Sequence, residues 1–283
     1  MSSENTNPLG EIQKISSLTN AQVKSMRGLS QRKNRRSTNT FLAEGLKLII
    51  DGLDAGWEIE TFAYSKSVLA HDTGGHDRAQ AVLDAAVRAR KAGANILEVT
   101  DAVMEKIARR DNPQMVVGVF RQRMDDLKAL LSADNGLWVC LEGIKDPGNL
   151  GTILRTCEAA GVDGVILLGE TTDPFGLEAV RASMGSLFHV RLARISRQDF
   201  TDARATWPGR IIGTHLSGKA DFRSVSKTRP LTILMGNEQS GLPDDITETC
   251  DDLVIIPMRG KADSLNLAVA TGIIVFDAVL AGS

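Results

Sequence analysis

Asn149-Leu150-Gly151-Thr152-Ile153-Leu154-Arg155 is the segment from which the fold of this chain can be inferred, together with two later segments. These are Leu234-Met235-Gly236-Asn237-Glu238, and Ile256-Pro257-Met258 followed by Ser264-Leu265-Asn266. Each ends or follows a run of apolar residues with the length of a buried strand. Ligands of parallel sheets bind beyond the carboxyl ends of the strands, so the three segments are expected to form one ligand site.

The second half of the chain has the pattern of a parallel sheet. Its strand candidates are residues 137–141, 164–168, 190–192, 210–213, 231–235 and 253–256. Such nearly continuous apolar runs, with helical segments between them, indicate strands covered on both faces. Neither a Gly-x-Gly-x-x-Gly turn nor a P-loop follows the first strand, which argues against a dinucleotide dehydrogenase and a P-loop NTPase. The expected fold class is α/β with a mostly parallel sheet.

In this order and at these separations, the three segments resemble the motifs of the SpoU (TrmH-like) RNA ribose methyltransferases. The resemblance spans roughly residues 137 to 280. It implies a knotted, SPOUT-type methyltransferase domain, in which the C-terminal segment threads through a loop. It also implies S-adenosyl-L-methionine as cofactor, a ribose 2′-hydroxyl of RNA as methyl acceptor, and a homodimer that brings residues of two chains together.

The resemblance assigns roles to individual residues. The catalytic residues that it implies are Arg155, Asn149, Glu238, Ser264 and Asn266. The cofactor-binding residues that it implies are Leu234, Met235, Gly236, Ile256, Met258, Leu265 and Asn266. Structural alternatives remain open for four of them, since Arg155 could also be a solvated helix residue. Asn149 could serve only its turn, Ser264 could only cap the last helix, and Glu238 could be a surface side chain.

Arg155 is expected about two turns into the helix that follows the turn Asp146-Pro147-Gly148-Asn149. A ribose hydroxyl is a poor nucleophile at neutral pH and must lose its proton during methyl transfer. Because a guanidinium keeps its proton in proteins, a role as general base is disfavoured. We expect Arg155 to stabilise the developing alkoxide and to hold a neighbouring phosphate with its planar fork.

Length and composition predict two domains. Residues 1–14 are polar and are expected to form a disordered lead-in. Residues 15–121 alternate strand and helix patterns, and residues 122–136 have the composition of a linker to the methyltransferase domain at 137–283. The segment Phe41-Leu42-Ala43-Glu44-Gly45 makes the first domain similar to the substrate-binding domain of SpoU proteins, which implies that it binds RNA.

A basic cluster lies near the start of the first domain, although the formal net charge of the chain is −2. It comprises Lys24, Arg27, Arg32, Lys33, Arg35 and Arg36, with no acidic residue between them. A local basic patch is sufficient to attract RNA phosphates. We predict that RNA is bound by Arg32, Lys33, Arg35 and Arg36. A solvated helix face is the alternative.

Composition also argues against several classes of protein. No apolar run approaches the roughly 20 residues that span a bilayer, and the first residues lack the pattern of a secretory signal. A cytoplasmic protein without a membrane partner is therefore expected. Cys140, Cys157 and Cys250 form no Cys-x-x-Cys pair, which favours reduced core thiols, and no metal site is expected.

Two alternatives to ribose methylation remain. A related knotted methyltransferase could modify a base, although Arg155 and Ser264-Leu265-Asn266 favour ribose. A non-catalytic RNA-binding protein could retain the same fold. Among substrates, ribosomal RNA is preferred over transfer RNA, because a separate N-terminal domain accompanies many relatives that act on rRNA.

Overall fold

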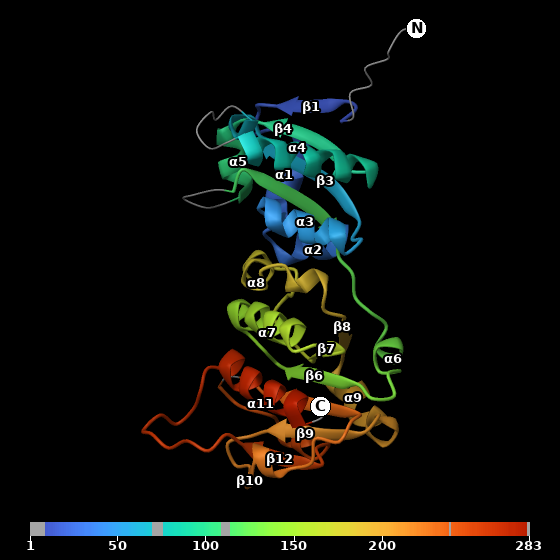
Figure 1. Cartoon of the computed structure of the whole chain (residues 1–283), viewed down its shortest axis with the longest axis vertical. Helices are drawn as coiled ribbons and strands as arrows, with labels where there is room; N and C mark the ends of the chain where they lie inside the picture. The colour runs from blue at the N-terminus through green and yellow to red at the C-terminus, as the bar shows by residue number, and fades with distance from the viewer. Residues whose placement is uncertain (1–8, 70–75, 109–113, 238, 282–283) are drawn as a thin grey trace. The chain divides into compact units, whose positions relative to one another are not determined.

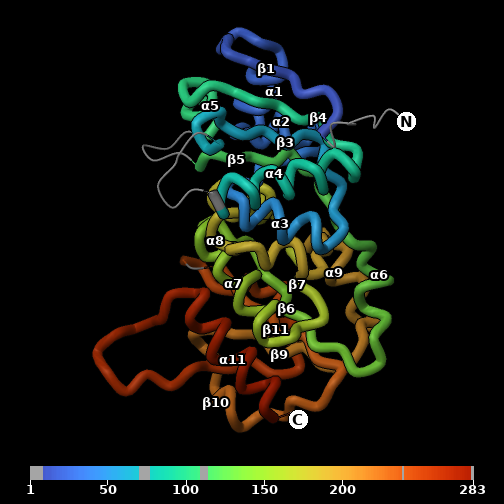
Figure 2. The backbone as a smooth tube through the Cα atoms, turned by 45° about the horizontal axis from the view of Figure 1, so that its top comes forward, coloured from blue at the N-terminus to red at the C-terminus, as the bar shows by residue number. Residues whose placement is uncertain are grey.

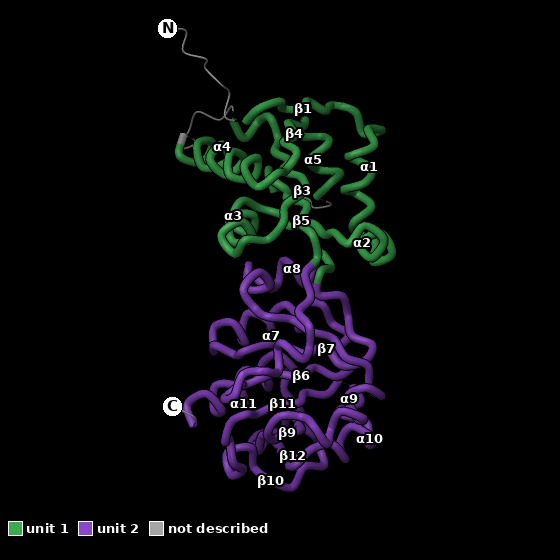
Figure 3. The backbone as a smooth tube through the Cα atoms, turned by 90° about the vertical axis from the view of Figure 1, so that its right-hand side faces the viewer, with its two compact units in different colours: residues 1–122, 175–177 green, residues 123–174, 178–283 purple. Residues whose placement is uncertain are grey.

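The computed structural model describes residues 9–69, 76–108, 114–237 and 239–281. The chain divides into two compact units, coloured green and purple in Figure 3. The first unit comprises residues 1–122 and 175–177, and the second comprises residues 123–174 and 178–283. Among the described residues, none of the helices combines the length and the apolar character needed to cross a membrane.

The first unit is built on a five-stranded sheet with the order β1-β4-β3-β5-β2 (Figure 1). Strand β5 runs antiparallel to β2 and β3, whereas β4 runs parallel to β1 and β3. Helices α1 and α5 contribute to the core on one face, α3 packs against β2 and β5, and α4 packs against β3 and β4. The strands are β1 Ile12–Ile15, β2 Thr40–Glu44, β3 Ile59–Ser65, β4 Asn95–Val99 and β5 Val116–Arg121. The helices are α1 Ala21–Gly28, α2 Arg32–Thr38, α3 Leu46–Asp54, the 3₁₀ turn η1 Lys66–Leu69, α4 His76–Lys91 and α5 Asp101–Ala108.

The prediction of a disordered lead-in over residues 1–14 is wrong for its last residues. Strand β1 pairs in parallel with β4, with Ile12 opposite Ile96. Leu9 is buried, and its carbonyl oxygen accepts a hydrogen bond of 2.8 Å from Arg90 Nε. Ile15 is buried in the core with α1 and α5. The polar composition of the segment concealed the few apolar side chains that hold it in place.

The stretch predicted as a linker contains a helix, α6 Leu127–Leu130. Asp126 caps this helix by accepting a hydrogen bond of 2.9 Å from the N–H of Ala129. Leu130 is fully buried, and its carbonyl oxygen accepts a hydrogen bond of 3.1 Å from the indole of Trp138. This part of the stretch therefore belongs to the packed second unit and not to a free connection.

The second unit is built on a sheet of seven parallel strands with the order β10-β12-β9-β11-β6-β7-β8. Five of the strands match predicted ones closely, whereas the sixth, β8, shares only residue 192 with the predicted strand 190–192. The α/β class with a mostly parallel sheet is confirmed. The two-residue strand β10 was not predicted. The bounds are β6 Leu137–Glu142, β7 Gly164–Leu168, β8 Leu192–Ile195, β9 Arg210–Thr214, β10 Ala220–Asp221, β11 Leu231–Met235 and β12 Asp252–Ile255.

Helices lie on both sides of this sheet (Figure 2, Figure 3). Trp138 and Cys140 of β6 belong to a core that also includes side chains of α6, α9 and α10. Helices α7 and α11 pack against each other, α7 also against β7 and α11 against β11. The helices are α7 Pro147–Ala159, α8 Leu177–Ala182, α9 Arg197–Ala203, α10 Asp244–Thr247 and α11 Leu267–Ala281, with 3₁₀ turns η2 Ser186–Phe188, η3 Arg204–Thr206 and η4 Phe222–Ser224.

Helix α11 has an apolar side that is exposed to solvent in this single chain. The helix is apolar on almost every side, and its buried residues include Thr271, Ile274 and Val275. Four large apolar side chains are exposed instead, at spacings of four, three and four residues, which places them along one stripe. This apolar stripe of α11 consists of Val269, Ile273, Phe276 and Leu280, with exposed fractions of 52%, 38%, 43% and 74%.

Candidate active site

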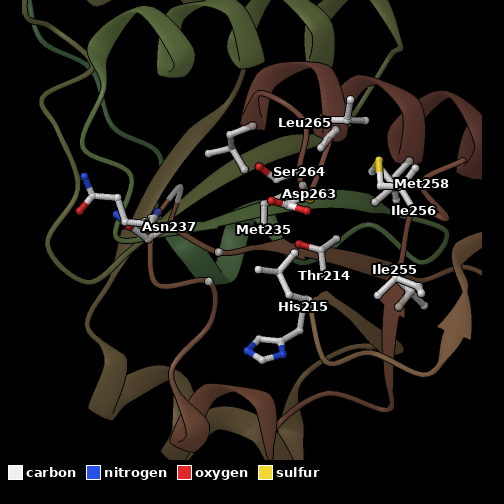
Figure 4. Close-up of a pocket in the computed structure, with 18 residues that line it drawn as sticks. Thr214, His215, Met235, Asn237, Ile255, Ile256, Met258, Asp263, Ser264 and Leu265 are labelled. Atoms are coloured by element: carbon white, nitrogen blue, oxygen red, sulfur yellow. Dashed lines mark hydrogen bonds between the residues drawn. The ribbon is translucent and has the colours of Figure 1, made fainter. Parts of the chain in front are cut away.

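A cavity of about 370 Å³ lies at the carboxyl ends of β9, β11 and β12 (Figure 4). Its volume is within the range of about 300–1,000 Å³ that is usual for small-molecule sites. Four parts of the chain line it. They are residues 214–216 after β9, residues 235–237, 239 and 241 after β11, residues 254–256, 258 and 263–265 from β12 onward, and residues 267, 270 and 274 of α11.

The first predicted segment begins helix α7 beside the end of β6. Asp146 caps the helix by accepting a hydrogen bond of 2.5 Å from the N–H of Asn149. Pro147 stands at the start of the helix, where a missing N–H has no cost. The turn that was expected from composition is therefore a capped helix start, and it fixes where the side chain of Asn149 begins.

The second segment forms a tight turn after β11. The N–H and C=O of Asn237 pair with those of Gly241 at 3.1 and 3.0 Å, which closes the turn. A Cβ atom added at Gly236 would lie 2.4 Å from the carbonyl carbon of Gly241, so a larger residue would not fit there. Asn237 Nδ2 also donates a hydrogen bond of 2.7 Å to the carbonyl oxygen of Gly143, which ties this turn to the end of β6.

The third segment leads into α11. The structure rules out the alternative that Ser264 caps this helix. The cap of the helix is Asn266 and not Ser264, because Asn266 Oδ1 accepts hydrogen bonds from the N–H groups of Ala268 and Val269 at 2.9 and 3.3 Å. Asn266 Nδ2 donates a hydrogen bond of 2.9 Å to Asn149 Oδ1. Two predicted catalytic residues, 117 positions apart, therefore touch.

An ion pair with a buried carboxylate joins β6 to α9 next to the first two segments. Glu142 ends β6 with 1% of its side chain exposed, and Arg197 at the start of α9 donates to Glu142 Oε1 from Nε at 2.8 Å and also from Nη2. The next residue is Gly143, whose carbonyl oxygen accepts from Asn237. Arg197, Glu142, Gly143 and Asn237, named here the β6–β11 brace, connect three elements of the site.

The predicted cofactor-binding residues divide into two groups. Met235, Gly236, Ile256, Met258 and Leu265 line the cavity. Leu234 and Asn266 do not line the cavity. Leu234 is fully buried in the core shared with α9 and α10, because alternate residues of a strand point to opposite faces of the sheet.

The predicted catalytic residues also differ in position. Ser264 lines the cavity, and Asn149 and Asn266 are bonded to each other outside its lining. Arg155 is exposed on α7 and is absent from the lining, and its side chain forms no hydrogen bond or ion pair with another described residue. Glu238 lies outside the described residues.

Sequence reasoning missed the contribution of β9 and one charged residue. Thr214, His215 and Leu216 follow the predicted strand 210–213 and line the cavity. The rule that ligands bind at carboxyl ends could have included them, but the segment has no distinctive motif. Asp263, which directly precedes Ser264 of the third segment, had no predicted role, and it is the one carboxylate among the described lining residues.

The predicted RNA-binding residues are not equivalent. Lys33 and Arg36 are exposed, and Arg32 is half-buried. Arg35 is 4% exposed, and its Nη1 donates a hydrogen bond of 2.7 Å to the carbonyl oxygen of Leu29. Burial of Arg35 argues against its contact with RNA, because its guanidinium holds the turn between α1 and α2 from inside. No group of three His, Cys, Asp or Glu side chains suited to a metal occurs in the described part of the chain.

The fold and the cavity define the class of protein, and the chain belongs to the SpoU rRNA Methylase family, whose profile matches residues 136–276. Residues 20–118 match the MRM3-like substrate binding domain. The predicted family and its predicted N-terminal substrate-binding domain are thus confirmed.

Individual relatives cover nearly the whole chain. An AdoMet-bound rRNA methyltransferase from Sinorhizobium meliloti is 45% identical, with a TM-score of 0.86, and 95% of this chain and 98% of that one are covered. The 23S rRNA (uridine(2479)-2′-O)-methyltransferase of Streptomyces viridochromogenes is 31% identical over 89% of this chain and 86% of that protein. The 23S rRNA (guanosine(2553)-2′-O)-methyltransferase RlmP of Bacillus subtilis (strain 168) is 28% identical over 94% and 98%.

Proposed function

We propose that this chain transfers a methyl group from S-adenosylmethionine to a ribose 2′-hydroxyl of 23S ribosomal RNA. One observation carries the proposal: loops from distant parts of the second unit form one cavity, and the bond between Asn149 and Asn266 joins the first segment to its edge. Relatives that are named for 2′-O-methylation of 23S rRNA support it. Such a substrate implies action in the cytoplasm.

The cavity fits this cofactor. Val254, Ile255 and Ile256 offer an apolar wall for adenine, and the tight turn at Gly236 lets main-chain groups approach the ring edge. Met258 and Leu265 extend the apolar lining toward the polar residue Ser264. Bound S-adenosylmethionine supplies an electrophilic methyl group. The protein must hold it, admit the ribose and exclude competing water.

Arg155 is proposed to act on the ribose and not on the cofactor. Its exposed guanidinium, which has no partner among the described residues, is available to a phosphate and to the oxygen that develops negative charge. The bonded pair Asn149 and Asn266 is proposed to orient the ribose near Ser264. Glu238 is proposed to brace the loops of the site by accepting hydrogen bonds.

We further propose a homodimer that is formed through α11, within a knotted domain of the family type. The apolar stripe of α11 is a surface that water does not favour, and a second copy of the same stripe would cover it in a symmetric contact. Helix α7 lies against α11, since a Cβ atom at Gly272 would be 3.5 Å from Thr156 Cγ2. Arg155 precedes Thr156, so it stands close to this interface and can serve the partner's cavity.

Ribose methylation has a chemical signature that tests the function directly. A 2′-O-methyl group blocks attack of the hydroxyl on the adjacent phosphate, so the modified linkage resists alkaline cleavage. Position-resolved mapping of total RNA, with and without the gene, should show one resistant linkage in 23S rRNA. A methylated base without a resistant linkage would favour the base-modifying alternative. Cofactor and RNA binding with no methyl transfer would favour the non-catalytic one.

Arg155→Ala is expected to lower the rate of transfer by about 100- to 1,000-fold, the usual effect of losing one well-placed charge stabiliser. Cofactor affinity, measured by calorimetry, should change little because Arg155 does not line the cavity. Thr152→Ala, an exposed position one turn earlier on α7, is the control and should retain transfer. Equal loss of cofactor binding and transfer in Arg155→Ala would contradict the assigned role.

Mixing two inactive chains tests whether the site is shared. Arg155→Ala keeps the cavity, whereas Gly236→Val keeps Arg155 but displaces the turn that lines the cavity, because its Cβ would meet the backbone of Gly241. If Arg155 serves the partner, mixed dimers contain one complete site, and an equal mixture should regain about a quarter of wild-type activity. If both parts act within one chain, the mixture stays inactive. The expected loss of the dimer in Phe276→Asp, checked by light scattering against Leu18→Asp in the first unit, tests the interface itself.

A further inference from the structure

We propose that Asp263 makes the cavity prefer the positively charged sulfonium of S-adenosylmethionine over the neutral thioether of the reaction product. This inference rests on the proposed function, because it takes the cavity to be the cofactor site. It goes beyond that function by assigning the discrimination between substrate cofactor and spent cofactor to one side chain. That side chain lies outside the residues predicted from the family motifs.

The charge of the cavity is carried by Asp263. The described lining residues include no Lys or Arg, and Asp263 is their only carboxylate. In Figure 4 its oxygens lie beside Ser264 and Met235, within the group of side chains that surrounds the cavity. No hydrogen bond or ion pair joins Asp263 to another residue in the described part of the chain. Its negative charge is therefore not already neutralised by the protein.

The second titratable group of the lining, His215, is held in a defined orientation. Its Nδ1 accepts the N–H of Ser217 at 3.2 Å and lies 2.6 Å from Ser217 Oγ. Both of these contacts are with Ser217, and no ion pair joins His215 to Asp263 within the described part of the chain.

The position of Asp263 selects the sulfonium among the charged groups of the cofactor. Val254, Ile255 and Ile256 form the apolar end of the cavity, which suits adenine. Asp263 and Ser264 are polar residues of the lining. They directly precede Leu265 and Asn266, and Asn266 is hydrogen-bonded to Asn149. Methyl transfer must take place at this polar end, so the sulfur has to lie there as well.

The chemistry makes this charge useful. Methyl transfer breaks the bond between sulfur and the methyl carbon, leaves the electron pair on sulfur, forms the bond to the ribose oxygen and releases the hydroxyl proton to water. The sulfur is cationic before the transfer and neutral after it. A carboxylate nearby therefore attracts the cofactor before the reaction and loses that attraction afterwards, which favours release of the product.

Calorimetric titration of the full-length Asp263→Asn protein tests the proposal. Three probes are used: S-adenosylmethionine, S-adenosylhomocysteine, and 5′-methylthioadenosine, which lacks the amino-acid part. Asp263 is exposed, so its attraction is partly screened, and we expect about a three- to tenfold loss of affinity for S-adenosylmethionine. Affinity for the other two probes should change less than about twofold, since neither is a sulfonium. Asp263→Glu should restore most of the preference.

A matched control is Asp134→Asn, which removes the same charge from an exposed residue before β6, at the opposite end of the strands. It should leave all three affinities unchanged. Equal losses for S-adenosylmethionine and S-adenosylhomocysteine in Asp263→Asn would overturn the proposal, because they would place Asp263 at the ammonium that both share. Unchanged affinities would overturn it too. Failure of the wild-type protein to bind any probe would instead refute the cofactor site itself.

Discussion

At the scale of the residue, burial determines which side chains of the basic cluster are available to bind RNA. Arg35 and Arg36 are adjacent in the sequence, yet one is buried against the carbonyl oxygen of Leu29 and the other is exposed. Composition could not separate them, because α2 has too few apolar residues to reveal which side faces the core. By contrast, the helix start at Asp146 and the close turn at Gly236 could be predicted, since each depends on the local chemistry of one residue type.

Arg35→Met should lower the free energy of unfolding by about 1–3 kcal/mol, because it leaves the buried carbonyl oxygen of Leu29 without a donor. The affinity of the folded variant for RNA should equal that of the wild-type protein. Urea unfolding measures the first effect, and a filter-binding titration with rRNA fragments measures the second. Arg36→Met, at an exposed position, should leave stability within about 0.5 kcal/mol of wild type.

The exposed cations Lys33 and Arg36 keep the predicted role in RNA binding. Lys33→Gln with Arg36→Gln should weaken binding to all RNA sequences alike. The slope of log K against log salt should flatten by about one for each phosphate contact that is lost. Lys128→Gln together with Lys219→Gln removes two charges from the second unit and serves as the control. An unchanged slope in the first pair would identify those side chains as a solvated helix face.

At the scale of elements, the site depends on how strand ends are tied together. The strands of the second sheet other than β8 and β10 follow from their apolar runs, and so does the edge at which the cavity lies. The β6–β11 brace does not follow, because Arg197 and Glu142 are 55 positions apart and no local pattern connects them. The same holds for Asn149 and Asn266, whose contact depends on how α7 and α11 meet.

Arg197→Gln should destabilise the protein by about 1–3 kcal/mol, less than the 3–5 kcal/mol of a wholly buried pair, because 48% of the Arg197 side chain is exposed. The loss arises because the carboxylate of Glu142 stays buried without its cation. The double variant with Glu142→Gln should recover part of the stability, which a double-mutant cycle in urea measures. Strictly additive effects would show that the pair does not act as a unit.

At the scale of the molecule, all three cysteines belong to the second unit, and burial raises the pKa of each thiol. The pKa of Cys157 is raised to about 12 and that of Cys250 to about 11. The thiolate is the reactive form, so the folded second unit should resist thiol reagents at about pH 8. This agrees with the reduced core thiols that the sequence predicted.

Thiol labelling should therefore report opening of the second unit alone. In moderate urea, S-adenosylmethionine at about 100 times its Kd should slow labelling by about 100-fold, because a ligand that binds only the folded state stabilises it by RT ln(1 + [L]/Kd). Mass spectrometry of labelled peptides identifies the cysteine concerned. Rapid labelling of Cys157 in native buffer would contradict the buried environment assigned to it.

The order of the strands along the chain also governs when activity can begin during synthesis. The cavity draws residues from β9 up to Ile274 of α11. A growing polypeptide that has emerged from the ribosome only as far as β12 can pair most of its second sheet, yet Asp263, Asn266 and α11 are still missing. An unfinished chain therefore has no complete cavity in which to bind the methyl donor. An enzyme whose proposed target is ribosomal RNA is thereby kept inert on the ribosome that is producing it.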